Sequence, residues 1–274
     1  MITELKSLIG VEHSLQDASA ALCRLTAALG APVVGAFHVT CADETEAECL
    51  GAFQDSFANA LLPELKFARR APFHLATLGA RYEPGALAIA EQHFATTDAA
   101  HAFKVLFVKL NAHVAVEGAG SRMAFGQMRR YDMPSTACGA LHALLEDGGA
   151  LPFLADLRSA FRSRGVDRIA ALCAPDMIDP AQRSLFAAVA SAELQAQAVL
   201  ADIARHRSHS PTYYVVVPCV TLNRTGPDTE VLCGVHVVDQ RVGPGAAQSY
   251  GLGDDPTAYR LSWEGQRVHL RRAQ

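Results

Sequence analysis

A long apolar segment near the middle of the chain limits the possible folds more than any other feature. Residues 102–118, AFKVLFVKLNAHVAVEG, are rich in β-branched and other apolar side chains and predict one long strand or a bent one. Residues 31–41, APVVGAFHVTC, predict a buried strand ending at Cys41, and 212–239 predict two strands around a turn at 223–228. Near-continuous apolar strands are typical of a sheet that is covered on both faces.

Helical patterns alternate with these strands. Leucines from Leu5 to Leu29 recur at helical spacing and predict one amphipathic helix before Gly30. Further helices are predicted over 43–70, 82–95, 152–165 and 179–207, and from about Pro134, with another strand over 166–174. The alternation predicts an α/β fold, a single domain over 1–274 with a central mixed sheet covered by helices. Within it we expect an N-terminal helix over 1–30, an α/β core over 31–240, and a C-terminal loop and strands over 241–274.

Charge and cysteine content exclude several classes of protein. The formal charge is -4 and the basic residues form no stripe, which disfavours nucleic-acid binding. The seven cysteines are an odd number and widely spread, which fits a reducing compartment better than a disulfide framework. The N-terminus lacks a basic start followed by an apolar run, and no stretch reaches the roughly 18 apolar residues of a membrane span. We therefore expect a cytoplasmic protein without a membrane segment.

Three residues could carry metal chemistry. Cys41 ends a predicted strand and Asp43 follows it in CADE, residues 41–44; strand ends are where α/β folds build sites. His113 lies in the long apolar strand, and Cys138 lies near a helix start, where backbone N–H groups favour a thiolate. Each has an ordinary alternative: a buried cysteine beside a helix-capping aspartate, a core histidine, and a buried or reactive thiol.

Taken together, the three residues form a recognisable ligand set. Two thiolates and an imidazole are typical ligands of tetrahedral zinc, and a fourth position left to water makes such a site catalytic. The ligands are separated by 72 and 25 residues, which excludes a zinc finger and predicts a site assembled by the fold.

Four segments carry a resemblance to a known family. CADE, LGARYEPGA, NAHVAVEG and RRYDMPSTACGAL, spread over residues 31–146, resemble the limiting-CO2-inducible protein B/C family, regarded as divergent β-type carbonic anhydrases. The resemblance implies a β-carbonic-anhydrase-like fold, a homodimer, and Zn2+ ligands Cys41, His113 and Cys138. It also implies an aspartate–arginine dyad with Asp43, and the reversible hydration of CO2 to bicarbonate and a proton through a zinc-bound hydroxide.

The chain departs from the ordinary β-carbonic anhydrase pattern in two places. There an arginine follows the aspartate by two residues, where this chain has Thr45, and there the histidine and second cysteine lie close together in sequence. Both departures fit the limiting-CO2 group and leave the arginine to come from elsewhere. Arg81, in LGARYEPGA, is our candidate. The other arginines left open are Arg69, Arg70, Arg129 and Arg130.

Further side chains near the motifs have weaker expectations. The aromatic residues that could line an apolar CO2 pocket, or simply pack in the core, are Phe37, Tyr82, Phe125 and Tyr131. The histidines close to the motifs are more typical of structural or surface residues than of proton shuttles; they are His38, His74 and His142. The cysteines interpreted as buried thiols are Cys49, Cys173, Cys219 and Cys233.

Other functions remain open at this stage. One is a catalytically silent relative acting as a scaffold or as a CO2/bicarbonate-responsive interaction protein, which the intact ligand set disfavours. Another is a different zinc enzyme, such as a small hydrolase, which would need a wide cleft and an added general base. A thiol-redox protein ranks lowest because the chain has no C-x-x-C pair.

Overall fold

The computed structural model describes most of the chain. The described residues are 2–30, 33–42, 51, 72–92, 103–118, 123–130, 133–145, 182–206, 208, 210–241, 245, 247–252, 259–264 and 267–272. The helices are α1 Thr3–Ser7, α2 Leu15–Leu29, η2 Leu78–Ala80 (a 3-10 helix), α4 Ala86–Gln92, α5 Gly139–Leu145 and α8 Arg183–Arg205. The strands are β1 Glu12–Ser14, β2 Val33–Cys41, β3 Phe73–Thr77, β4 Lys104–Glu117, β5 Ala124–Phe125, β6 Gln127–Arg130, β7 Met133–Thr136, β8 Thr212–Asn223, β9 Thr229–Leu232, β10 Gly234–Asp239, β11 Gln248–Gly251, β12 Tyr259–Glu264 and β13 Arg267–Arg272.

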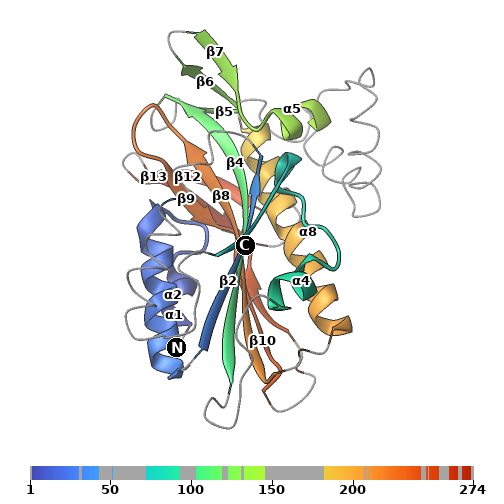
Figure 1. The fold of residues 1–274 in the computed structure, drawn as a ribbon. Helices are drawn as coiled ribbons and strands as arrows, with labels where there is room; N and C mark the ends of the chain where they lie inside the picture. The colour runs from blue at the N-terminus through green and yellow to red at the C-terminus, as the bar shows by residue number, and fades with distance from the viewer. Residues whose placement is uncertain are drawn as a thin grey trace.

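A nine-stranded mixed sheet forms the centre of the protein (Figure 1). Its main order is β1-β9-β8-β4-β2-β3. Strands β3, β2, β4 and β8 are parallel, whereas β9, β10, β1 and β11 join in antiparallel pairs. Every residue of β8, and all of β4 except Glu117, is buried, as the apolar runs predicted. The α/β fold with a central mixed sheet is therefore confirmed.

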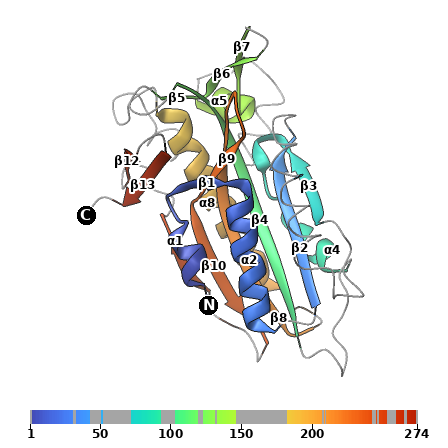
Figure 2. The ribbon, with the colours of Figure 1, turned by 90° about the vertical axis from the view of Figure 1, so that its left-hand side faces the viewer.

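Helices cover the two faces of the sheet. Helices α1 and α2 lie on one face, and α4 and α8 lie on the other (Figures 1 and 2). On the α2 face, Leu22 and Leu25 pack with Phe107 and Val217. On the α8 face, Val199 packs against the sheet in a second cluster of apolar side chains. The alternating side chains of β4 supply both clusters, which explains its apolar sequence.

The prediction of one N-terminal helix over Leu5–Leu29 is wrong, because the segment is divided into α1, β1 and α2. Gly10 interrupts the helix with φ +72°, and a Cβ there would lie 2.1 Å from the carbonyl oxygen of Leu270. Its own N–H donates to Leu232 at 2.8 Å. Helix α2 then starts anew, with Asp17 accepting the N–H of Ser14 at 3.0 Å. Leucine periodicity cannot reveal this break, since leucines on both sides of it enter the core.

Two other boundaries differ from the prediction. The helix expected from about Pro134 begins at Gly139 instead, because 133–136 pair with 127–130 as a hairpin. The segment 212–239 forms three strands rather than two, since the chain passes from β9 to β10 at Cys233 and each pairs with a different part of β8. Of the helix predicted over 43–70, the structure describes residue 51 alone, which is helical; the helix predicted over 152–165 and the strand over 166–174 lie outside the described residues.

Helix α8 is the one described helix long and apolar enough to span a membrane by length and composition. However, 67% of the most apolar 18-residue stretch of this helix is buried inside the protein, and the helix packs on β4 and β8. Core packing accounts for its composition. The cytoplasmic location and the domain boundaries stay predictions.

Candidate metal centre

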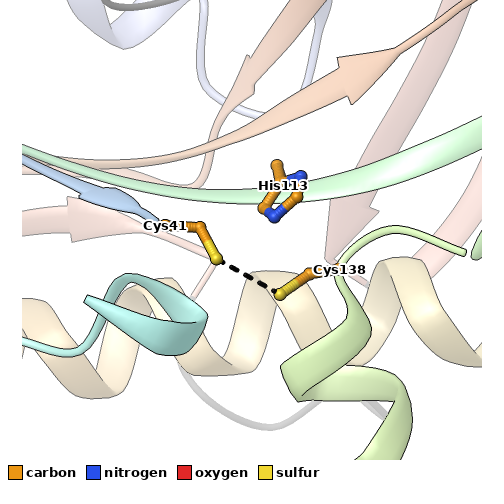
Figure 3. Close-up of side chains that lie close together, drawn as sticks. All are labelled: Cys41, His113 and Cys138. Carbon is orange, nitrogen blue, oxygen red and sulfur yellow. Dashed lines mark hydrogen bonds between the residues drawn. The ribbon is translucent and has the colours of Figure 1, made fainter. Parts of the chain in front are cut away.

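Three side chains from distant parts of the sequence meet at one end of the sheet (Figure 3). Cys41 is the last residue of β2, His113 lies near the end of β4, and Cys138 directly precedes α5. Because β2 and β4 are parallel, their carboxyl ends reach the same edge, where ligand sites of α/β folds form. All three side chains are buried. The sequence-predicted ligands are thus brought together.

Their geometry fits a tetrahedral zinc ion. The candidate donor atoms all lie within 4.8 Å of one another, and the two sulfur atoms are 3.6 Å apart. Two sulfurs on a tetrahedral zinc, each about 2.3 Å from the metal, stand roughly 3.8 Å apart. Among the described residues, no other group of three or more His, Cys, Asp or Glu side chains could hold a metal ion.

The two thiols share one proton unequally. A hydrogen bond from Cys138 lowers the pKa of Cys41 to about 4, against the opposing effect of burial and with help from His113 and the Gly79 N–H. The pKa of Cys138 is raised well above its usual value, by its bond to the Cys41 thiolate and by burial. The pair therefore holds one ready thiolate and one thiol that a metal would have to deprotonate.

Two supporting contacts were not predicted as site features. The N–H of Gly79 donates to Cys41 Sγ at 3.3 Å, from the 3-10 turn within LGARYEPGA. Gly79 has φ +71°, a conformation that favours glycine, so this glycine was the available signal. His113 Nδ1 lies 2.9 Å from Asn223 Oδ1 at the end of β8. Nothing in the sequence around Asn223 indicated that contact.

Of the predicted aspartate–arginine dyad, the structure describes only Arg81. Asp43 lies outside the described residues. Arg81 follows the turn that contacts Cys41, so it lies close along the chain to the site. Its Nη2 forms an ion pair with Glu83, while its Nε is buried and makes no hydrogen bond with any described residue. The alternatives Arg69 and Arg70 also lie outside the described residues; Arg129 and Arg130 lie on β6, and their side chains are not described.

The other predicted side chains separate into two groups. Phe125 joins the apolar cluster that contains Cys41 and Cys138. Phe37 and Tyr82 instead pack in the core beneath α8, with ring centroids 6.3 Å apart. Tyr131 lies outside the described residues.

The histidines close to the motifs and the remaining cysteines differ in their exposure. His38 is fully buried in mid-sheet, and His74 contacts Thr40 at 2.7 Å. His142 is partly exposed on α5. Cys219 and Cys233 are buried, which confirms their interpretation as core thiols. Cys49 and Cys173 lie outside the described residues.

No protein-family model matches the chain, and no curated protein matches its sequence. Solved structures do match it. PtLCIB4, a homolog of the limiting CO2-inducible protein LCIB, has a TM-score of 0.63 at 14% identity, covering 90% of this chain and 98% of its own. This chain has the fold of that LCIB homolog.

Two single-residue variants of PtLCIB4 give the same result. Their TM-scores are 0.63 and 0.60, both at 13% identity, covering 89% and 91% of this chain and 97% and 99% of their own. The match spans nearly the whole of both chains. It confirms, at the level of fold, the resemblance seen in the motifs around Cys41, His113 and Cys138.

Proposed function

We propose that this chain is a carbonic anhydrase of the LCIB type, which binds one zinc ion through Cys41, His113 and Cys138. It would hydrate CO2 reversibly to bicarbonate and a proton. The convergence of these three buried donors at the carboxyl ends of β2 and β4 carries the proposal. The LCIB-like fold and the four family-like segments support it.

Zinc bound by three protein ligands would lower the pKa of water at its open position to near 7 and so supply the nucleophile at neutral pH. The protein's own contribution would be apolar surroundings. Val114, Met123, Phe125 and Leu141 pack in the same cluster as the two cysteines. Such surroundings would suit a small apolar substrate such as CO2 and would keep bulk water away.

Asp43 and Arg81 would complete the site as a dyad. The arginine would keep Asp43 ionised and turned away from the ligands, because a nearby positive charge favours the carboxylate. The buried Nε of Arg81 supports this role, since it is a donor without a described acceptor. The Glu83 carboxylate, which pairs with Nη2, would compete with Asp43 for the same guanidinium.

Stopped-flow measurement of CO2 hydration on zinc-quantified protein near pH 8.5 tests the proposal. We expect one zinc per chain and fast hydration, with both lost in Cys138→Ser. Cys219→Ser is the matched control, because Cys219 is a buried thiol outside the cluster. Bound zinc without hydration between about pH 7 and 9 would contradict the enzymatic function.

The Arg81–Glu83 ion pair favours a second function. If Arg81 stays on Glu83, the dyad is incomplete, and the chain would act as a catalytically silent scaffold or a CO2/bicarbonate-responsive interaction protein. Zinc binding with no hydration in the wild type, but hydration in Glu83→Gln, would identify that case.

We also propose a homodimer. Leu78 and Ile89 are the large apolar side chains exposed on the described surface, and Leu78 immediately precedes Gly79 at the site. Sedimentation velocity of the wild type and of Leu78→Asp with Ile89→Asp tests whether they lie in the interface; we expect a dimer that the double variant dissociates.

A further inference from the structure

A chain of buried hydrogen bonds leads from His113 to the turn between β8 and β9. His113 Nδ1 lies 2.9 Å from Asn223 Oδ1. Asn223 Nδ2 donates to Asp228 Oδ2, also at 2.9 Å. The other oxygen of Asp228 accepts the N–H of Arg224 at 3.0 Å. Nothing in the motifs around the cysteines includes this chain of contacts.

The direction of this chain follows from donor and acceptor chemistry. Both oxygens of Asp228 accept N–H groups, as an ionised carboxylate does, and such a carboxylate cannot donate. The amide NH2 of Asn223 must therefore face Asp228, which turns its carbonyl oxygen toward His113. An amide oxygen only accepts, so His113 Nδ1 must carry the hydrogen. In a neutral imidazole the other nitrogen, Nε2, then holds the lone pair.

Figure 3 shows a ring nitrogen of His113 directed toward the two cysteines. Since Nδ1 is engaged by Asn223, this nitrogen is Nε2. We infer that Asp228, acting through Asn223, fixes the tautomer of His113 so that its unprotonated nitrogen faces the two thiols. Asn223 and Asp228 are positioning residues, one and two hydrogen bonds away from His113.

The turn that carries Asp228 is itself anchored. Arg224 Nη2 donates to Glu12 Oε1 at 2.7 Å, and Thr229 Oγ1 donates to the same oxygen at 2.7 Å. The N–H of Val268 donates to Glu12 Oε2 at 2.7 Å. Glu12 is a buried residue of β1, so a carboxylate from the N-terminal region holds both ends of the turn. The position of Asp228 is therefore imposed by the fold.

The orientation of a second buried amide, between the same strands β4 and β8, is not imposed by a carboxylate. Asn111 donates to Thr221 Oγ1 at 2.7 Å and accepts from Cys219 Sγ at 2.8 Å. A hydroxyl both donates and accepts, so Thr221 does not impose an orientation on the amide. Thr221→Val is therefore a matched control: Thr221 lies opposite His113 in the register of β4 and β8, and the change removes a buried hydrogen bond to Asn111 beside His113 but keeps the Asn223–His113 contact.

The test is the protonated ring nitrogen of His113, read from long-range 1H–15N spectra of metal-free protein at about pH 8, with the signal assigned through His113→Gln. We expect Nδ1–H in the wild type and in Thr221→Val. Asp228→Asn lets the amide of Asn223 turn either way, so we expect both tautomers. The exchange Asn223→Asp with Asp228→Asn restores an acceptor for Nδ1 and should restore the single tautomer.

Zinc affinity, measured by chelator competition, gives the second readout. We expect a loss of roughly 10–100-fold in Asp228→Asn, the range typical of residues that orient a metal-ligating histidine. We expect recovery in the exchange variant and a change within about twofold in Thr221→Val. Nε2–H in the wild type, or an unchanged single tautomer in Asp228→Asn, would overturn the inference.

The significance of this inference rests on the proposed zinc site, but the two fail separately. The tautomer is read without metal and without activity. Zinc binding without CO2 hydration would refute the proposed function and leave the tautomer result standing.

Discussion

Two of the buried polar residues of strand β4, Lys109 and His113, lie four residues apart and have different surroundings. Lys109 pairs with Glu230 at 2.7 Å in the middle of the sheet, and His113 joins Cys41 and Cys138 at its end. Lys109, Glu230 and His113 are each at most 2% exposed. Burial and polarity therefore do not distinguish them, and the difference lies in which groups they face: a carboxylate for Lys109, and two thiols for His113.

The charges of Lys109 and Glu230 are matched inside the sheet, where His13 also lies 3.6 Å from Glu230; we call Lys109 and Glu230 the closed pair. Burial alone would raise the pKa of Glu230, but the Lys109 ammonium and His13 outweigh it and lower that pKa overall. The two opposite charges neutralise each other between strands β4 and β9. At the end of β4, by contrast, two sulfurs and a ring nitrogen lie close together, and no cationic side chain is part of this group. These three atoms could bind a metal cation. The candidate site therefore differs from the closed pair because its three donor atoms come together from Cys41, His113 and Cys138.

The largest expected effect concerns the closed pair. Lys109→Met should destabilise the protein by about 3–5 kcal/mol, because Glu230 would keep a buried and uncompensated charge. Zinc affinity should stay within about threefold. Urea denaturation and chelator competition measure the two quantities. Combining Lys109→Met with Glu230→Leu should recover most of the stability; a single variant as stable as the wild type would show that the pair is not a structural unit.

Cys41→Ser should have the opposite effect: a large loss of zinc affinity and little change in stability. Removing a ligand should cost at least about a hundredfold in zinc affinity, more than the loss of an orienting residue. The metal-free protein should keep its unfolding free energy within about 1 kcal/mol, because the hydroxyl nearly fills the space of the thiol. Equal losses of stability in Cys41→Ser and Lys109→Met would remove the distinction between the two regions.

The unequal thiols predict how zinc binding depends on pH. Cys41 has a pKa of about 4, so it is ionised at neutral pH, whereas Cys138, with its raised pKa, still holds its proton. Zinc must displace that one proton, and affinity should rise about tenfold per pH unit below about pH 7, where a zinc-bound water would keep its protons. Calorimetry at about pH 6.5, in buffers of different ionisation enthalpy, should find about one proton released per zinc. Two released protons at that pH would show that both thiols start protonated.

The smallest expected effect lies at the edge of the site. Glu83→Gln should change stability by less than about 1 kcal/mol, because the Arg81–Glu83 pair is partly exposed. If Asp43 and Glu83 compete for Arg81, hydration should rise by up to roughly threefold. Arg81→Lys, which keeps the charge but loses the planar fork, should lower it. Slower CO2 hydration in Glu83→Gln would show instead that Glu83 supports the position of Arg81.

The sequence predicted the strands and the grouping of Cys41, His113 and Cys138 better than it predicted the helix boundaries. Strand β4 could be predicted because a strand buried on both faces needs an unbroken apolar run. Cys41 and His113 could be placed because parallel strands end at one edge. The break at Gly10 could not, since it depends on Leu232 and Leu270 far along the chain.

The supporting contacts of the site were equally hidden. Asn223 and Asp228 carry no pattern of their own, and their role depends on the parallel register of β8 beside β4. Lys109 shows the same limit, because a lysine inside an apolar run does not indicate which carboxylate, here Glu230, will neutralise it. Pairings across strands are decided by the fold, and local sequence does not encode them.

Zinc K-edge X-ray absorption on the metal-loaded protein would identify the atoms that hold the metal. We expect two Zn–S distances of about 2.3 Å and at least one Zn–N distance of roughly 2.0–2.1 Å, with one sulfur lost in Cys138→Ser. A first shell of nitrogen and oxygen alone, or a spectrum unchanged in that variant, would contradict a zinc centre built from Cys41, His113 and Cys138.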